Sequence, residues 1–159
     1  MSDRYPAEIY IGGVIPRRVL DTLVRKITEA GVSLNGYDDD CATEDEIRAA
    51  LKEGNTLDLY DCRAAYGHFD ELEKFLIQHG IHFNHHSEAC YEYDAENTYY
   101  RGGKILTMAA TQSGECLLPV TDILEVLNNH ELDDFGKLEA LTRLAVPPET
   151  KPLEPIQCV

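Results

Sequence analysis

The 159-residue chain contains no tryptophan, and its five cysteines form no CxxC pair. The cysteines are scattered, at positions 41, 62, 90, 116 and 158. A small secreted scaffold uses an even set of cysteines that pair as disulfides. We therefore expect reduced thiols, a cytoplasmic location and a fold that needs no disulfide.

Long apolar runs and targeting signals are also missing. No uncharged apolar stretch approaches the roughly 20 residues that span a bilayer. The first residues, MSDRYPAEIYIGG, lack the basic start and the apolar core of a signal peptide. The sequence therefore predicts a soluble protein that does not contact a membrane. A chain of this length buries roughly two thirds of its unfolded surface, which is enough for a core of its own.

Basic side chains are few: 14 Lys and Arg stand against 29 Asp and Glu, a formal net charge of −15. Residues 37–100 carry four of these basic groups and sixteen of the acidic ones. A negative field repels phosphate backbones and anionic lipids. We therefore expect neither nucleic acid nor membranes as direct ligands, although an acidic surface can also serve solubility alone.

Two segments of the chain are similar at an offset of 49 residues, Asp21–Leu34 and Asp70–Phe83. Each follows a short apolar stretch and reads as strand, helix, glycine and strand. Gly31 and Gly80 are expected to end the helices in the left-handed conformation. Two such units predict an α/β (α+β) fold, a ferredoxin-like split βαβ sandwich with an internal repeat. Two ordinary βαβ units would leave the same pattern.

The two predicted helices carry the expected core. Their apolar side chains recur at helical spacing, so we expect them to lie against one face of a common sheet. The residues concerned are Leu20, Leu23, Ile27, Phe69, Leu72 and Leu76.

Further elements are predicted outside the two similar segments. Thr43 and Glu46 form a capping box before a short helix that Gly54 ends. Two extra hairpins are expected between residues 89 and 108, and two helices after Pro119. Four prolines make residues 147–159 an extended, Pro-rich tail, so that residues 1–146 form a single acidic domain.

The densest set of metal-ligand residue types lies in residues 79–90, which contain four histidines and a cysteine. Side chains of a strand alternate between its two faces, so at most two of these histidines point the same way. The spacing matches no closed zinc module. We therefore expect no metal and no cofactor. The less favoured alternative is a zinc or thiol enzyme built on His82, His86, Cys90 or Cys62.

Acidic and aromatic side chains gather in residues 88–100. Tyrosine is enriched at interface hot spots, because its ring buries a large area at a small entropic cost. The sequence thus favours a non-enzymatic inhibitor or nucleic-acid mimic that blocks a basic, nucleic-acid-handling protein. The predicted partner-binding residues are Asp38, Asp39, Asp40, Glu88, Glu92, Asp94, Glu96, Tyr99 and Tyr100.

Small acidic proteins that phages and mobile elements use against host defence, of the anti-restriction and anti-CRISPR type, share this composition. The likeness is one of composition and involves no motif. The alternative class is a regulatory domain that binds a small molecule at a sheet edge, as ferredoxin-like sandwiches commonly do. Self-association as a homodimer is compatible with either function.

Overall fold

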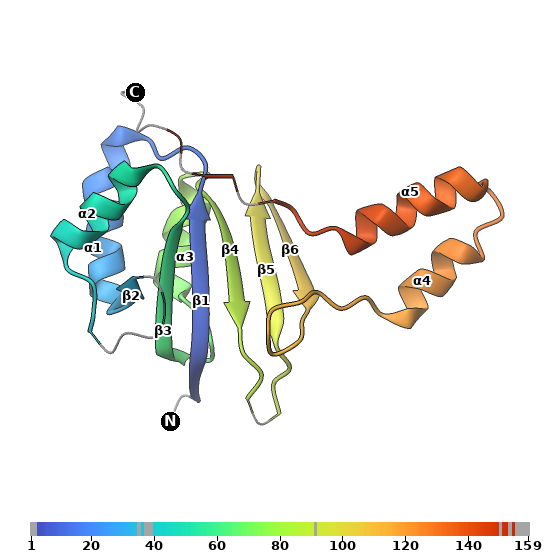
Figure 1. The fold of residues 1–159 in the computed structure, drawn as a ribbon, viewed down its shortest axis with the longest axis horizontal. Coiled ribbons are helices and arrows are strands. Elements are labelled where there is room, and N and C mark those ends of the chain that lie inside the picture. The colour runs from blue at the N-terminus through green and yellow to red at the C-terminus, as the bar shows by residue number, and fades with distance from the viewer. Residues whose placement is uncertain are drawn as a thin grey trace.

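The computed structural model describes residues 3–34, 36, 40–90, 92–149, 151–152 and 154. In these residues six strands form one antiparallel sheet, in the order β2-β3-β1-β4-β5-β6 (Figure 1). The strands are β1 (Arg4–Gly12), β2 (Ser33–Leu34), β3 (Leu57–Ala65), β4 (His82–Ser87), β5 (Glu96–Arg101) and β6 (Lys104–Ala109). The α-helices are α1 (Leu20–Ala30), α2 (Glu44–Glu53), α3 (Asp70–Gln78), α4 (Val120–Leu127) and α5 (Asp134–Ala145). The predicted mixed α+β class is confirmed.

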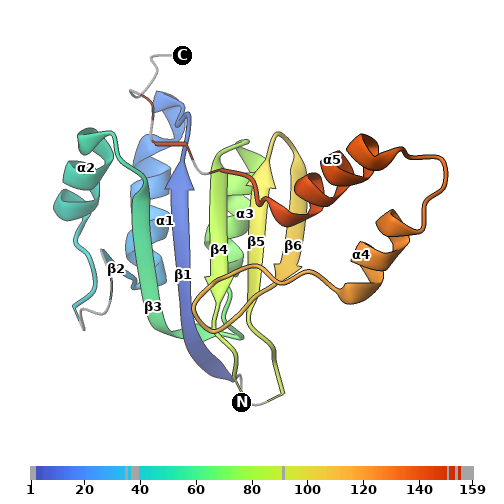
Figure 2. The same cartoon turned by 45° about the vertical axis from the view of Figure 1, so that its right-hand side comes forward.

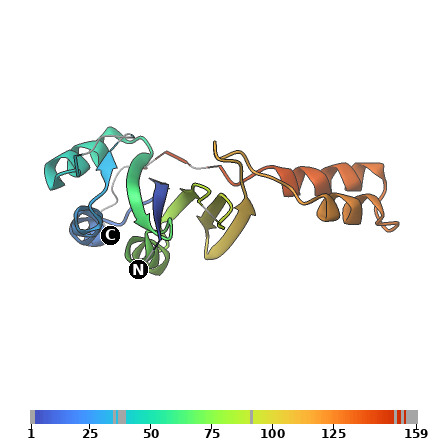
Figure 3. The same cartoon turned by 90° about the horizontal axis from the view of Figure 1, so that it is seen from below.

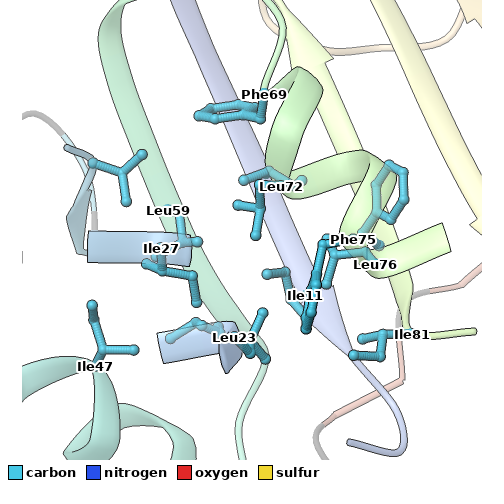
Figure 4. Packing of buried hydrophobic residues seen from close by; sticks show 14 of the residues in the cluster. Ile11, Leu23, Ile27, Ile47, Leu59, Phe69, Leu72, Phe75, Leu76 and Ile81 are labelled. Carbon is cyan, nitrogen blue, oxygen red and sulfur yellow. The ribbon is translucent and has the colours of Figure 1, made fainter. Parts of the chain in front are cut away.

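Helices α1 and α3 lie side by side on one face of the sheet, as Figure 3 shows. Alternation along β1 turns Ile9 and Ile11 toward these helices and Glu8 and Tyr10 toward the opposite face. Figure 4 shows Ile11 in the cluster of side chains from both helices and the sheet. Burial of each such side chain stabilises the fold by roughly 1.5–3 kcal/mol.

The predicted core residues lie where the sequence places them. Five of them are buried in this cluster, and Leu20 is partly buried and packs against it. The five buried residues are Leu23, Ile27, Phe69, Leu72 and Leu76.

The predicted helix ends are also confirmed. The Thr43 hydroxyl accepts a hydrogen bond from the Glu46 N–H, and the Glu46 carboxylate accepts one from the Thr43 N–H at 2.8 Å. Gly31 ends α1 with φ +68°, and Gly80 adopts φ +68° directly after the last turn of α3. A residue with a Cβ atom rarely adopts this conformation.

The two extra hairpins are confirmed in part. Gly102 and Gly103 form the turn between β5 and β6, both with positive φ, as a two-residue turn of type I′ requires. The strand expected at residues 89–93 is wrong. The connection from β4 to β5 is a loop, held by reciprocal backbone hydrogen bonds of 2.9 Å between Cys90 and Tyr93. In the described residues this loop connects β4 to β5 with no named strand between them.

The two C-terminal helices form a hairpin, here called the arm, that projects beyond β6 (Figure 2). Both helices are fully described, and neither contains a buried residue. Phe135 is 75% exposed and Leu138 is 62% exposed. The helices themselves were predicted, whereas the exposure of their apolar side chains was not. In the described part of the chain, no helix is long and apolar enough to cross a membrane.

The chain then returns from the arm toward the sheet. The Arg101 guanidinium donates hydrogen bonds of 3.1 and 3.2 Å to the carbonyl oxygen of Glu149. The Gly13 N–H donates to the carbonyl oxygen of Lys151 at 3.2 Å, and the Glu154 N–H donates to that of Gly13 at 2.8 Å. The described residues of the Pro-rich tail are therefore attached to the ends of β1 and β5.

Candidate functional site

The predicted partner-binding residues come from two separate segments of the chain. Asp38 and Asp39 lie outside the described residues, and Asp40 is exposed in the segment before α2. The remaining carboxylates lie on the connection between β4 and β5 and at the start of β5. These are Glu88, Glu92, Asp94 and Glu96.

Tyr99 and Tyr100 are buried, which argues against the prediction that they are anchors for a partner. The Tyr99 hydroxyl lies 3.1 Å from the Cys116 Sγ, and burial raises the pKa of this phenol. The Tyr100 ring stacks on Phe83, and its hydroxyl donates to the carbonyl oxygen of Ile77 at 3.1 Å. Adjacent strand residues point to opposite faces, and both faces are covered at this position.

Three of the predicted carboxylates surround a cavity of about 370 Å³ that we call the tyrosine pocket. Its aromatic walls come from three separate parts of the chain. The aromatic and acidic side chains that line it, together with one histidine, are Tyr5, Tyr66, His68, Glu92, Tyr93, Asp94 and Glu96. The sequence predicted the three carboxylates of this site, but it did not predict Tyr5 and Tyr66.

The rings differ in exposure. Tyr5 is buried and stacks on Tyr93, with 6.0 Å between the ring centroids. Tyr66 is 45% exposed and Tyr93 is 47% exposed. Burial raises the pKa of the Tyr5 phenol, and the neighbouring Tyr93 contributes to the same shift. The pocket thus offers two accessible aromatic side chains beside a group of carboxylates.

The turn from β3 to α3 sets the position of Tyr66. Tyr66 has φ +54°, the only positive φ at a non-glycine residue in the described chain. This conformation costs roughly 1–2 kcal/mol. The Tyr66 N–H donates to the carbonyl oxygen of Asp3 at 2.8 Å, which fastens the turn to the start of β1. Strained residues of this kind cluster at functional sites.

Gly67 brings the Tyr5 ring close to this turn. It has φ +65°, and a Cβ atom at this position would lie 2.3 Å from the Tyr5 Cε2 and 2.9 Å from the Ser87 Cβ. A side chain at residue 67 would therefore displace the buried wall of the tyrosine pocket.

No protein-family model, curated protein or solved structure matches this chain.

The zinc or thiol site that the sequence left as an alternative is not assembled in the described residues. His82 and His86 lie on the sheet face opposite α1 and α3, and His86 Nδ1 lies 2.8 Å from the Asn97 Oδ1. Burial, followed by the charge of Arg101, lowers the pKa of His82. Cys62 is exposed on β3.

A different group of metal-ligand residues does converge: His68, Glu73 and His85. His85 is 1% exposed and faces α3, because alternation along β4 places it on the same face as Phe83. Burial lowers the pKa of His85 to about 4 and raises the pKa of Glu73. A histidine on the apolar face of a predicted strand was the only sequence signal for this group.

A smaller cavity, of about 230 Å³, lies on the opposite face of the sheet. Glu8, Tyr10, His86 and Asn97 contribute to its lining, and Gly114 closes one side. Cavities that bind small organic ligands usually measure about 300–1,000 Å³. Its size therefore disfavours a small-molecule site on this face.

Proposed function

We propose that the chain is a non-enzymatic, acidic protein-binding module that inhibits a basic, nucleic-acid-handling partner. The tyrosine pocket is the observation that carries this proposal. It combines the accessible rings of Tyr66 and Tyr93 with the carboxylates of Glu92, Asp94 and Glu96. Aromatic faces and carboxylates together suit an arginine or lysine side chain.

The energetics of such a contact favour a protein partner. A cation over an aromatic ring contributes about 0.5–1 kcal/mol when exposed and about 2 kcal/mol when desolvated. Proteins that handle nucleic acid present arginine and lysine side chains to phosphates, and carboxylates at the same positions would compete with them. The net charge of −15 would speed the encounter with such a surface. A cytoplasmic anti-defence role, of the anti-restriction or anti-CRISPR type, is one setting for this inhibition.

We also infer a ferredoxin-like split βαβ sandwich at the centre of the fold. The first four strands lie in the order β2-β3-β1-β4, with α1 between β1 and β2 and α3 between β3 and β4. On this interpretation α2 is an insertion, β5 and β6 extend the sheet, and the two similar segments are equivalent halves. The same architecture supports many functions, so the choice between inhibitor and small-molecule regulator depends on the pockets.

The test is capture of cellular partners with the full chain, followed by binding kinetics over a salt series. Reversing Glu92 and Asp94 to Lys should slow association and also speed dissociation, because both carboxylates line the pocket. The matched control reverses Glu125 and Glu131, two exposed carboxylates of the arm and its connecting loop. This control has the same net charge and should affect association alone.

Three outcomes would contradict the proposal. The captured partner could lack a basic groove, the two double variants could behave alike, or the chain itself could bind DNA or RNA. In each of these cases the acidity would serve solubility.

A second copy of the chain is a further partner that we propose, on a different surface. Strand β6 is the edge of the sheet, its sequence KILTMA contains no carboxylate, and Ile105 and Leu106 are more than one-third exposed. Exposed apolar edge strands pair readily with other strands. Antiparallel pairing of β6 with its own copy is self-complementary about a twofold axis. The arm projects on the same side and would cover the second copy (Figure 1).

Mass measurement in solution tests the homodimer. The chain should have twice its monomer mass, and Ile105→Lys should convert it to a monomer with an unchanged circular dichroism spectrum. The control Asn55→Lys adds the same charge at an exposed residue between α2 and β3, far from the β6 edge, and should remain dimeric. A monomeric wild-type chain at high micromolar concentration would rule the dimer out.

A further inference from the structure

The group formed by His68, Glu73 and His85 combines the turn before α3, the helix α3 itself and strand β4. One ligand atom from each residue lies within 4.8 Å of the other two. His68 and Glu73 are five positions apart in the sequence, whereas His85 joins them from β4, through the packing of α3 on the sheet.

Hydrogen bonding fixes the tautomer of His85. Its Nε2 lies 2.6 Å from the carbonyl oxygen of Gly67, which can only accept, so Nε2 carries the hydrogen. In the neutral ring the lone pair is then on Nδ1, which lies 3.3 Å from the Glu73 Oε1. That oxygen already accepts a hydrogen bond of 3.1 Å from the Phe69 N–H. Two acceptors at this separation require a positive centre between them, either a proton or a metal ion.

The separation suits a metal ion. Zinc binds imidazole nitrogen and carboxylate oxygen at about 2.0–2.2 Å in tetrahedral geometry, which places neighbouring ligand atoms about 3.3–3.5 Å apart. The distance of 3.3 Å between His85 Nδ1 and Glu73 Oε1 agrees with this value. A ring nitrogen of His68 completes a set of two imidazoles and one carboxylate.

We propose that His68, Glu73 and His85 bind a divalent transition metal ion, with zinc as the first candidate. Two histidines and one glutamate hold zinc in sites that keep a fourth position open. His68 is half-buried and lines both the tyrosine pocket and a cavity of about 360 Å³ beside Arg4 and Lys26. The open position would face these cavities, which also give the ion a path of entry.

Neighbouring backbone groups hold two of these three ligands. The Gly67 carbonyl holds His85 through the nitrogen that does not face Glu73, and the Phe69 N–H orients the Glu73 carboxylate. Metal ligands usually have such partners, and removing one typically lowers metal affinity 10- to 100-fold. The ligand set differs from the histidines and cysteine that the sequence suggested, and it departs from the expectation that the chain binds no metal.

Titration of the full-length, chelator-treated chain with Zn²⁺ and with Co²⁺ tests the site. We expect one equivalent to bind at neutral pH, and the cobalt form to show the intense visible absorption of four-coordinate Co²⁺. His68→Ala should lower Zn²⁺ affinity at least about tenfold, since it removes a direct ligand. This residue lies on a half-buried turn, so the variant should keep the wild-type circular dichroism spectrum. The matched control, His82→Ala, removes a half-buried histidine from the other face and should bind zinc as the wild type does.

Glu73→Gln provides a second variant that preserves shape and removes the carboxylate. It should weaken Zn²⁺ binding and change the cobalt spectrum. Two results would contradict the metal site. The chain could fail to bind one equivalent of Zn²⁺, or it could bind weakly with equal losses in His68→Ala and His82→Ala. Either result would show that a proton alone joins His85 to Glu73. Because the proposed protein-binding function depends on Glu92 and Asp94, its failure would leave this titration unchanged.

Discussion

The Nε2 nitrogen of His85 lies 2.6 Å from the carbonyl oxygen of Gly67. This contact joins β4 to the turn that carries Tyr66 and His68, and Gly67 itself adopts φ +65°. The tyrosine pocket and the proposed metal site therefore depend on the same turn. A disturbance at residue 67 is expected to affect both.

Gly67→Ala should be strongly destabilising. The left-handed conformation costs alanine roughly 1–2 kcal/mol, and overpacking against Tyr5 and Ser87 adds about 1–3 kcal/mol. Chemical denaturation should report both effects. Gly80→Ala is the matched control, because Gly80 has φ +68° and no atom within 4 Å of a built Cβ. It should cost only the conformational part, and an equal loss in both variants would show that the Tyr5 contact is unimportant.

The helices and their ends could be predicted because their signals are local. Apolar spacing identified α1 and α3, and Thr43 with Glu46 identified the start of α2. The strand expected at residues 89–93 was wrong for the opposite reason. Alternating tyrosines indicated a strand, but strand pairing depends on distant residues, and β5 pairs directly with β4.

The candidate site could be predicted only in part. The carboxylates of the β4–β5 connection follow from charge alone, whereas Tyr5 and Tyr66 join them through the pairing of β1 with β3. The burial of Tyr99 was not predicted, because the segment containing Cys116 covers its face of the sheet. Neither contact leaves a local signal in the sequence.

Leu72→Ala should lower the free energy of unfolding by roughly 2–5 kcal/mol, because it leaves a cavity in the core. Leu138→Ala removes the same atoms from an exposed side chain of the arm and should change stability by about 0.5 kcal/mol or less in the monomer. Urea denaturation at low protein concentration measures both. Similar losses in the two variants would contradict the division between core and arm.

Asp58→Asn should stabilise the protein at neutral pH. Burial, followed by the charge of Glu8, raises the pKa of the Asp58 carboxyl above its ordinary value of 3.8. The folded state then binds more protons than the unfolded state just above pH 3.8. The contribution of Asp58 to the free energy of unfolding is fully present below pH 3.8, and it is lost as the pH rises through the pKa of Asp58 in the folded state. The stability difference between Asp58→Asn and the wild type should therefore grow from pH 3.5 to pH 7, and a constant difference would contradict the raised pKa.

Tyr66→Gly should separate stability from binding. Glycine adopts φ +54° without steric cost, so the change relieves roughly 1–2 kcal/mol of strain in the folded state. The greater conformational freedom of glycine in the unfolded chain costs roughly 0.5–1 kcal/mol. The free energy of unfolding should thus stay equal or rise slightly. The same change removes an accessible ring of the tyrosine pocket, so a captured basic partner should dissociate faster.

Tyr66→Asn is the control, since asparagine tolerates this conformation but also lacks the ring. Both variants should lose the same amount of binding. A marked loss of stability in Tyr66→Gly would contradict the prediction, because it would mean that the ring supports the fold and that Tyr66 is not held in place for a partner.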